Sequence, residues 1–248
     1  MNIVVCISSV PDTTSKISFT ENSSKFDNSG IQFVINPYDE FGLTKAMMLK
    51  EKTAGNVIVI TVGDVSVEAV MRKALAIGAD SAIRINAKPT DSYFTANAIS
   101  NYLKENPADL IIAGRESIDY NGGAVGGMIA EMMNLPFVNA CNGLEIDGNT
   151  AKLSREIDGG KENLSANLPL VIGGQKGLVE ESDLRIPNMR GIMQARSKPL
   201  IVVEPSSDEN LTSSENFEKP AEKSACKLVE VGNEAELVSL LQSEAKVI

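Results

Sequence analysis

Residues 56–85 read NVIVITVGDVSVEAVMRKALAIGADSAIRI, and this stretch decides the fold class. The apolar run at 56–62 is typical of a buried strand, 65–77 has the spacing of an amphipathic helix, and 81–85 is a second apolar run. A strand, a helix and a strand in such close succession predict two parallel strands joined by a crossover helix.

The same alternation continues on both sides of this stretch. It predicts strands at 2–7, 16–19, 31–35 and 109–113, and helices at 37–52, 92–105 and 122–134. We therefore expect an α/β domain with a Rossmann-like, mostly parallel sheet and helices on both faces. Ligands of such sheets bind beyond the carboxyl ends of the strands.

The texture of the chain changes after residue 136. Three apolar runs separated by Asp-Gly and Gly-Gly turns favour an antiparallel extension, and a further strand pattern follows them before a stretch of little periodicity at 173–198. The three antiparallel runs are 137–144, 150–155 and 163–166, and further strands are expected at 168–172 and, after the stretch of little periodicity, at 200–203.

The last part of the chain has the composition of a linker. Residues 204–224 are rich in Ser, Glu, Asp and Pro, and a short strand at 227–231 and a helix at 233–244 are expected to follow. We expect residues 1–203 to form the nucleotide-binding α/β domain, and 204–248 to form a linker and a C-terminal arm that docks elsewhere.

Composition excludes several classes of function. The 248 residues include no histidine, so catalytic triads, Cys-His dyads and imidazole metal sites are excluded, and no catalytic residue is assigned. Cys6, Cys141 and Cys226 are isolated, which argues against a metal site and fits a reducing cytoplasm. Acidic residues outnumber basic ones 33 to 23, which disfavours nucleic acid, and no apolar run is long enough for membrane insertion.

The segment AGRESIDYNGGAVGG at 113–127 is the first candidate for a ligand site. It follows an apolar strand and leads into a helix whose first turns carry only small residues, so a phosphate could approach the backbone N–H groups there. The alternative is that these glycines permit a tight turn and close helix packing. The spacing matches neither a Walker A loop nor a dinucleotide fingerprint.

Two shorter segments lie at other expected strand ends. Thr61-Val62-Gly63 ends the strand at 56–62 and is either a ligand-facing turn or an ordinary glycine turn. Asn36 precedes a proline that begins a helix, so it either caps that helix or hydrogen-bonds a base. The adjacent carboxylates Asp39 and Glu40 are interpreted as solvated charge near the positive end of the helix.

Residues 183–198, DLRIPNMRGIMQARSK, form a locally basic segment in an acidic chain. Its alternating apolar and arginine residues suit either an adaptable protein-binding surface or a core-facing helix with a solvated basic face.

Taken together, these segments resemble the small (beta) subunit of electron-transfer flavoproteins. The resemblance covers nearly the whole chain and is weakest from Ser206 to Ala225. It is carried, in family order, by Val10–Thr13, Asn36–Glu40, Ala74–Asp80, Gly114–Asp119, Arg155–Gly160 and Pro187–Ala195.

The resemblance implies an electron carrier and not an enzyme with its own catalytic residues. A large (alpha) subunit would hold most of an FAD to which the small subunit contributes surface, and electrons would pass from flavin dehydrogenases to a quinone reductase or another acceptor. The small subunit itself would bind AMP or, in bifurcating members, a second FAD, in a fold related to universal stress proteins.

The resemblance also implies where these ligands and partners bind. The nucleotide pocket maps onto Cys6, Asn36, Thr61, Val62, Gly63, Gly114, Asp119, Asn121, Gly122, Gly123, Ala124, Val125 and Gly126. The partner-recognition segment, at about 183–198, maps onto Pro187, Met189, Ile192 and Met193, with Met189 as the apolar anchor. The resemblance also implies that the C-terminal arm within 204–248 docks on the large subunit.

This sequence departs from the family pattern inside the nucleotide pocket. Gly123-Ala124-Val125 stands where many AMP-binding members have Asn-Gln-Thr, and Ser8-Ser9 replaces the usual basic pair. Val125-Gly126 is similar to bifurcating members, although Gly127 replaces their usual proline. AMP and FAD therefore both stay open, with AMP slightly favoured.

Two other classes of protein remain as alternatives. One is a free-standing adenine-nucleotide sensor of the universal stress protein type, against which the segment at 173–198 and the C-terminal arm argue. The other is an ATP-using enzyme of the same fold class, such as an adenylating ligase, against which the lack of a serine-glycine-rich pyrophosphate loop after the first strand argues.

Overall fold

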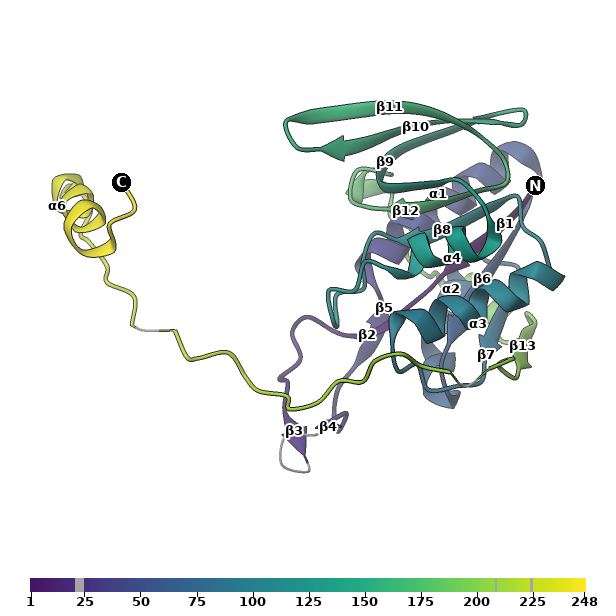
Figure 1. The fold of residues 1–248 in the computed structure, drawn as a ribbon, viewed down its shortest axis with the longest axis horizontal. Coiled ribbons are helices and arrows are strands. Elements are labelled where there is room, and N and C mark those ends of the chain that lie inside the picture. Colours follow the sequence, from purple (N-terminus) through teal and green to yellow (C-terminus); the bar gives the residue numbers. More distant parts are fainter. Residues whose placement is uncertain (21–24, 208, 224) are drawn as a thin grey trace.

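The computed structural model describes residues 1–20, 25–207, 209–223 and 225–248. Nine strands form the central sheet: β1 (Asn2–Cys6), β6 (Asn56–Val62), β7 (Ser81–Ile85), β8 (Leu110–Gly114), β9 (Phe137–Asp147), β10 (Thr150–Ile157), β11 (Gly160–Asn167), β12 (Leu170–Gly174) and β13 (Leu200–Val203). Their order across the sheet is β11-β10-β9-β12-β8-β1-β6-β7-β13 (Figure 1). Two short pairs join β2 (Ser9–Pro11) to β5 (Phe33–Ile35) and β3 (Phe19–Thr20) to β4 (Lys25–Phe26).

The sheet is parallel from β9 to β13, and β10 and β11 extend it in antiparallel fashion. In the centre, Ile3 of β1 pairs with Val57 of β6 on one side and with Leu110 of β8 on the other. The predicted α/β class and antiparallel extension are therefore confirmed. One connection was not predicted: β9 joins the parallel part through β12, which comes later in the chain.

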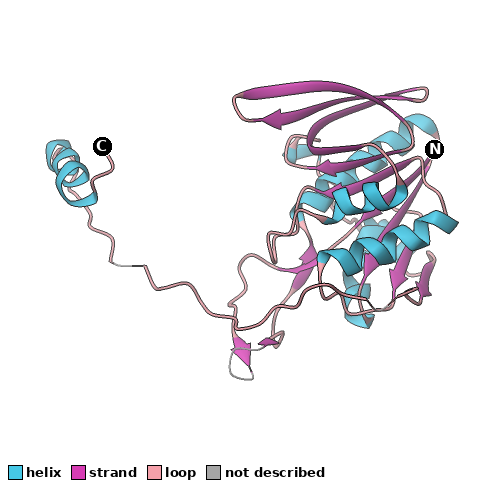
Figure 2. Ribbon diagram, viewed as in Figure 1, coloured by secondary structure: helices cyan, strands magenta, loops and turns pink. Residues whose placement is uncertain are grey.

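Helices cover both faces of the sheet (Figure 2). On one face lie α1 (Pro37–Thr53) and α2 (Glu68–Ile77), which follows the 3-10 turn η1 (Val65–Val67); on the other lie α3 (Ser92–Glu105) and α4 (Val125–Met133). Side chains of β1 alternate between the two cores, because successive residues of a strand point to opposite faces. Ile3 and Val5 pack on the α1–α2 side, and Val4 and Cys6 on the α3–α4 side.

The C-terminal arm runs over the domain before it leaves it. After η2 (Glu181–Asp183), α5 (Met189–Ala195) and β13, the backbone N–H groups of Leu211 and Thr212 donate to the Asp91 carboxylate, each at 2.7 Å. Further on, the rings of Phe19 and Phe217 stack at 5.4 Å. The arm ends in α6 (Glu234–Leu240) and the π-helical turn η3 (Leu241–Ala245), which lie apart from the sheet (Figure 1).

Several predicted boundaries differ from the structure. The helix predicted at 122–134 begins at Val125, because Gly122 is held in a turn by a bridge to Ser117. The strand predicted at 227–231 is wrong: that stretch is irregular and largely exposed. The strand predicted at 16–19 is β3, which lies at Phe19–Thr20. The stretch at 173–198 contains the end of β12, η2 and α5.

Candidate functional site

The strand order places a topological switch point beside β1. The chain passes from β1 through α1 to β6 on one side, and later returns through α3 to β8 on the other side. Since α1 and α4 cover opposite faces, the loops after β1 and after β8 diverge at the carboxyl edge of the sheet. Open α/β sheets bind ligands in the crevice that such diverging loops leave.

Asn36 joins these two loops. The side chain is fully buried; its Nδ2 donates to the backbone oxygen of Glu116 at 2.8 Å, and its Oδ1 accepts from the backbone N–H of Ile118 at 3.3 Å. Asn36 occupies the N-cap position of α1, but its side chain makes no capping hydrogen bond. Its amide therefore fixes the loop after β8 in place.

Asp39 is buried at the same junction, and the interpretation of this residue as solvated charge is wrong. Only 2% of it is exposed, and one carboxylate oxygen accepts from the backbone N–H of Ser8 at 2.7 Å. Burial raises the pKa of Asp39 to about 7, against the opposing hydrogen bonds from Ser8, Asn36 and Gly114. The charge of Asp119 raises this pKa further.

Helical spacing could have identified Asp39. It lies four residues before Leu43 and seven before Ala46, both of which are fully buried. Residues at this spacing share one face of a helix, so Asp39 continues the apolar face of α1. The adjacent residue Glu40 does not share this face of α1, and its carboxylate contacts the Lys73 ammonium group at 3.0 Å.

Cys6 ends β1 beneath this junction. Burial raises the pKa of its thiol to about 12, and the negative charge of Asp39 raises it further. A thiol of this kind stays protonated near neutral pH and is not a nucleophile. Cys6 can therefore line a pocket, but it does not supply chemistry.

The end of β6 offers a different surface. The hydroxyl oxygen of Thr61 is buried and has no hydrogen-bond partner among the described residues. Gly63 has a structural role, because a Cβ added there would lie 2.5 Å from a methyl carbon of Val67. The Gly63 oxygen also accepts from the buried guanidinium of Arg84 at 3.0 Å. Val62, between Thr61 and Gly63, belongs to the α3–α4 core.

The loop after β8 is folded by its own backbone. Ser117 and Gly122 exchange two backbone hydrogen bonds of 2.9 and 3.2 Å, the Ser117 hydroxyl donates to Asp119 at 2.6 Å, and Asn121 has a left-handed backbone with φ of 50°. Helix α4 then begins after Ala124, which provides no side-chain cap, so its first N–H groups have no side-chain acceptor there.

Three glycines of this region have different neighbours at the position where a side chain would begin: Gly114, Gly123 and Gly126. At Gly114, an added Cβ would lie 2.2 Å from a carboxylate oxygen of Asp39; at Gly126 it would lie 3.2 Å from the ring of Phe137. These two positions are therefore explained by close packing. An added Cβ at Gly123 would lie 3.2 Å from the backbone oxygen of Arg115, and this glycine stands at the entrance to α4.

A groove of about 340 Å3 beside this junction was not predicted. It is lined by Tyr38, Arg115, Glu156, Gln175, Lys176 and Gly177. The buried Gln175 accepts from Arg115 at 3.1 Å and donates to Glu156 at 2.7 Å. These residues come from α1, the loop after β8, β10 and the loop after β12, so no local pattern in the sequence brings them together.

The predicted partner-recognition residues lie on another surface. Met189 and Met193 of α5 are 76% and 69% exposed, and Asn188 caps this helix by accepting from Gly191 N–H at 2.8 Å. Ile192 and Pro187 line a second groove, of about 550 Å3, between α5 and α2. Only Ala195 of α5 is buried, so the alternative of a core-facing helix is wrong.

Comparison with known proteins gives the family of this chain. A family model described as electron transfer flavoprotein domain matches residues 24–208. The chain belongs to the electron transfer flavoprotein family.

Curated relatives agree along the full length. The electron transfer flavoprotein subunit beta of Bacillus subtilis (strain 168) is 36% identical over 100% of both chains. The subunit of the same name from Syntrophomonas wolfei is 33% identical over 91% of this chain and 88% of its own, and that from Bradyrhizobium diazoefficiens is 29% identical over 100% of both. The resemblance stated from the sequence is therefore confirmed.

As a beta subunit of an electron transfer flavoprotein, this chain is a component of an electron carrier. The family assignment decides against a free-standing nucleotide sensor and against an ATP-using enzyme. Among the described residues, no helix is long and apolar enough to cross a membrane, and no three Cys, Asp or Glu residues are grouped as metal ligands.

Proposed function

We propose that this beta subunit pairs with an electron transfer flavoprotein alpha subunit and binds AMP in its own domain at the switch point. The FAD that carries electrons would be shared with the alpha subunit. Electrons would enter from flavin dehydrogenases and leave to a quinone reductase or another acceptor, and the location would be cytoplasmic. The relatives carry the name electron transfer flavoprotein subunit beta, which supports the pairing.

The junction at the switch point is the observation that carries the nucleotide site. Asn36 ties the loop after β8 to the start of α1, and the carboxyl edge of the sheet is shaped there by residues far apart in the chain. The buried hydroxyl of Thr61 has no partner among the described residues, and a buried polar group without a partner is costly. A ligand hydroxyl or ring nitrogen would satisfy it.

The entrance to α4 fits the phosphate of such a nucleotide. No side chain caps its first N–H groups, which are the usual donors to an anion at a helix N-terminus. Gly122 leaves open space, since an added Cβ would meet only the Ser92 hydroxyl, at 3.8 Å. Gly123-Ala124-Val125 provides no polar side chain, so backbone N–H groups would make most of the phosphate contacts.

The proposed roles of the remaining pocket residues follow from their places. Cys6, Val62 and Gly63 would line the strand ends, Gly114 and Gly126 would keep the packing tight, and Asp119 and Asn121 would shape the turn. FAD in this pocket is the other outcome, and would add a second group that accepts and donates electrons.

Identification of the bound nucleotides tests this proposal. The full chain would be co-expressed with an alpha subunit, and the purified heterodimer denatured and its nucleotides quantified by mass spectrometry. We expect one FAD and one AMP per heterodimer. Two FAD per heterodimer would show that the pocket of the beta subunit binds FAD and not AMP. A heterodimer that holds one FAD and no other nucleotide would refute the proposed nucleotide site.

The variant Asn36→Ala tests whether AMP binds at the switch point. Losing both side-chain bonds to the loop after β8 should reduce the AMP content severalfold while the shared FAD remains, since Asn36 is proposed to act only in this pocket. Asn101→Ala is the matched control. Asn101 lies on α3, where its side chain donates an exposed hydrogen bond to Ser206, and the variant should retain one AMP per heterodimer.

The surface of α5 is proposed as the contact for dehydrogenases. Exposed methionines suit adaptable protein contacts, and Met189, Ile192, Met193 and Pro187 form an apolar surface among arginines. Met189→Ala should slow electron transfer from a dehydrogenase and leave flavin content intact. Ile157→Ala, at an exposed position of β10, is the control. An unchanged rate for Met189→Ala would remove the anchor assignment.

A further inference from the structure

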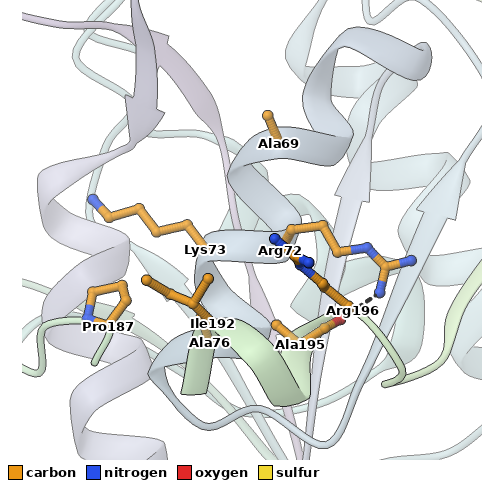
Figure 3. Close-up of a pocket in the computed structure, with 8 residues that line it drawn as sticks. All are labelled: Ala69, Arg72, Lys73, Ala76, Pro187, Ile192, Ala195 and Arg196. Carbon is orange, nitrogen blue, oxygen red and sulfur yellow. Dashed lines mark hydrogen bonds between the residues drawn. The ribbon is translucent and has the colours of Figure 1, made fainter. Parts of the chain in front are cut away.

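Helix α2 provides a cation, Arg72, that binds the carboxyl end of α5. Nη1 of Arg72 donates to the backbone oxygen of Ala195, at the last residue of α5, at 2.7 Å, and to that of Lys198 at 2.8 Å. Figure 3 shows the Arg72 guanidinium reaching across the groove to Ala195. Arg72 therefore binds carbonyl groups of α5 and of the turn after it.

A second cation makes the reverse connection. Nζ of Lys198, just after α5, donates to the backbone oxygens of Leu75 at 2.9 Å and Ala79 at 2.6 Å, at the carboxyl end of α2. Each helix end is thus bound by a side chain that belongs to the other segment. Partial burial lowers the pKa of Lys198, because it removes water from around the ammonium group.

The two helices also approach closely at a single residue. A Cβ added to Gly191 of α5 would lie 2.2 Å from the backbone oxygen of Ala76. Only glycine fits this contact, which fixes the height of α5 above α2. Gly191 therefore faces α2, while Met189 and Met193 of the same helix are exposed.

These contacts matter because α5 is short. It spans seven residues, and an isolated helix of that length is unstable in water. Its last carbonyl groups have no partner within the helix, and cations stabilise this end of a helix dipole. The Asn188 cap holds the other end. The order of α5 therefore depends on α2.

We propose that Arg72 and Lys198 are positioning residues that hold α5 against α2 and thereby present Met189 and Met193 to a partner protein in one fixed arrangement. The presentation of the methionines rests on the proposed function of this surface. The holding of α5 does not, because it depends only on contacts within this chain.

Amide hydrogen exchange in the heterodimer tests the holding of α5. Arg72→Gln and Lys198→Gln shorten the side chains so that they no longer reach the carbonyl groups, and we expect exchange at residues 189–195 to become about tenfold faster. Arg196→Gln removes the same charge from the same groove and should leave exchange as in wild type, since no described contact of its side chain reaches a carbonyl group of either helix. Arg72→Lys keeps one donor and should give an intermediate rate.

The kinetics of the same variants test the presentation of the methionines. With the flavin dehydrogenase that reduces the wild-type heterodimer, Arg72→Gln and Lys198→Gln should raise the KM for the heterodimer about fivefold. Flavin content and kcat should not change, which a general loss of folding would not produce.

The outcomes separate the two proposals. Unchanged exchange in both Gln variants overturns the holding of α5, whatever the kinetics. Faster exchange with an unchanged KM overturns the presentation role alone. If the wild-type heterodimer accepts no electrons from any flavin dehydrogenase, the proposed function fails, while the exchange experiment still decides whether Arg72 and Lys198 hold α5.

Discussion

Replacing Asp39 with Asn should alter how the stability of this chain depends on pH. The substitution keeps the size of the side chain and one acceptor oxygen for the N–H of Ser8, but it removes the ionisable group. Because Asp39 is only 2% exposed, its titration is coupled to folding.

The sign follows from the direction of the pKa shift. Burial raises the pKa of Asp39 from 3.8 to about 7 in the folded chain. Between these values the folded chain binds a proton that the unfolded chain has lost, so stability falls as pH rises. Each pH unit in this window is worth about 1.4 kcal/mol. From pH 5 to pH 8, wild type should lose about 2–3 kcal/mol relative to Asp39→Asn.

Urea denaturation of the full chain at pH 5, 6, 7 and 8 measures this difference. All other titrating groups are shared, so the difference between the two pH profiles isolates Asp39. Asp147→Asn, at an exposed carboxylate that ends β9, removes one negative charge and should keep the wild-type profile. Parallel profiles for wild type and Asp39→Asn would refute the reasoning.

Three further predictions concern packing, thiols and the arm. Gly114→Ala should destabilise the chain by about 2–4 kcal/mol in urea denaturation, because its Cβ would lie 2.2 Å from a buried carboxylate oxygen; an unchanged midpoint would contradict this. Of the three thiols, only the exposed Cys226 should react rapidly with a disulfide reagent at pH 7.5, while Cys6 and Cys141 react after denaturation; a second fast thiol would show that the core opens. Deleting 227–248 should leave the midpoint unchanged and weaken binding to the alpha subunit; loss of folding would contradict the arm as described.

The elements that alternate regularly were well predicted from the sequence. The strands at 81–85 and 200–203 and the helix at 92–105 have the predicted bounds, because an apolar period is a local property. The arrangement of β9 was not predictable in the same way. Its parallel pairing with β12 joins residues 137 and 171, and no local pattern specifies which strands become neighbours.

The candidate site was predicted only in its location. Strand ends and glycines indicated an edge of the sheet, and Asn36 does lie there. The sequence could not reveal that Asn36 binds the loop after β8, because its partner Glu116 lies eighty residues away. The prediction of a solvated Asp39 was wrong, because Asp39 shares the buried face of α1 with Leu43, whereas the adjacent Glu40 does not.

The exposed C-terminal arm affects how the unpaired beta chain would be handled by proteases and chaperones. From Glu204 onward no described residue is buried, and Leu228, Leu237 and Val238 are all exposed. Leu228 lies on irregular backbone and Leu237 and Val238 lie in α6, and exposed apolar segments of this kind are bound by proteases and chaperones. A beta chain made in excess of its partner would carry its own degradation signal, and pairing would conceal it. Unpaired beta chain should therefore be cleaved within 204–248 faster than the heterodimer in limited proteolysis.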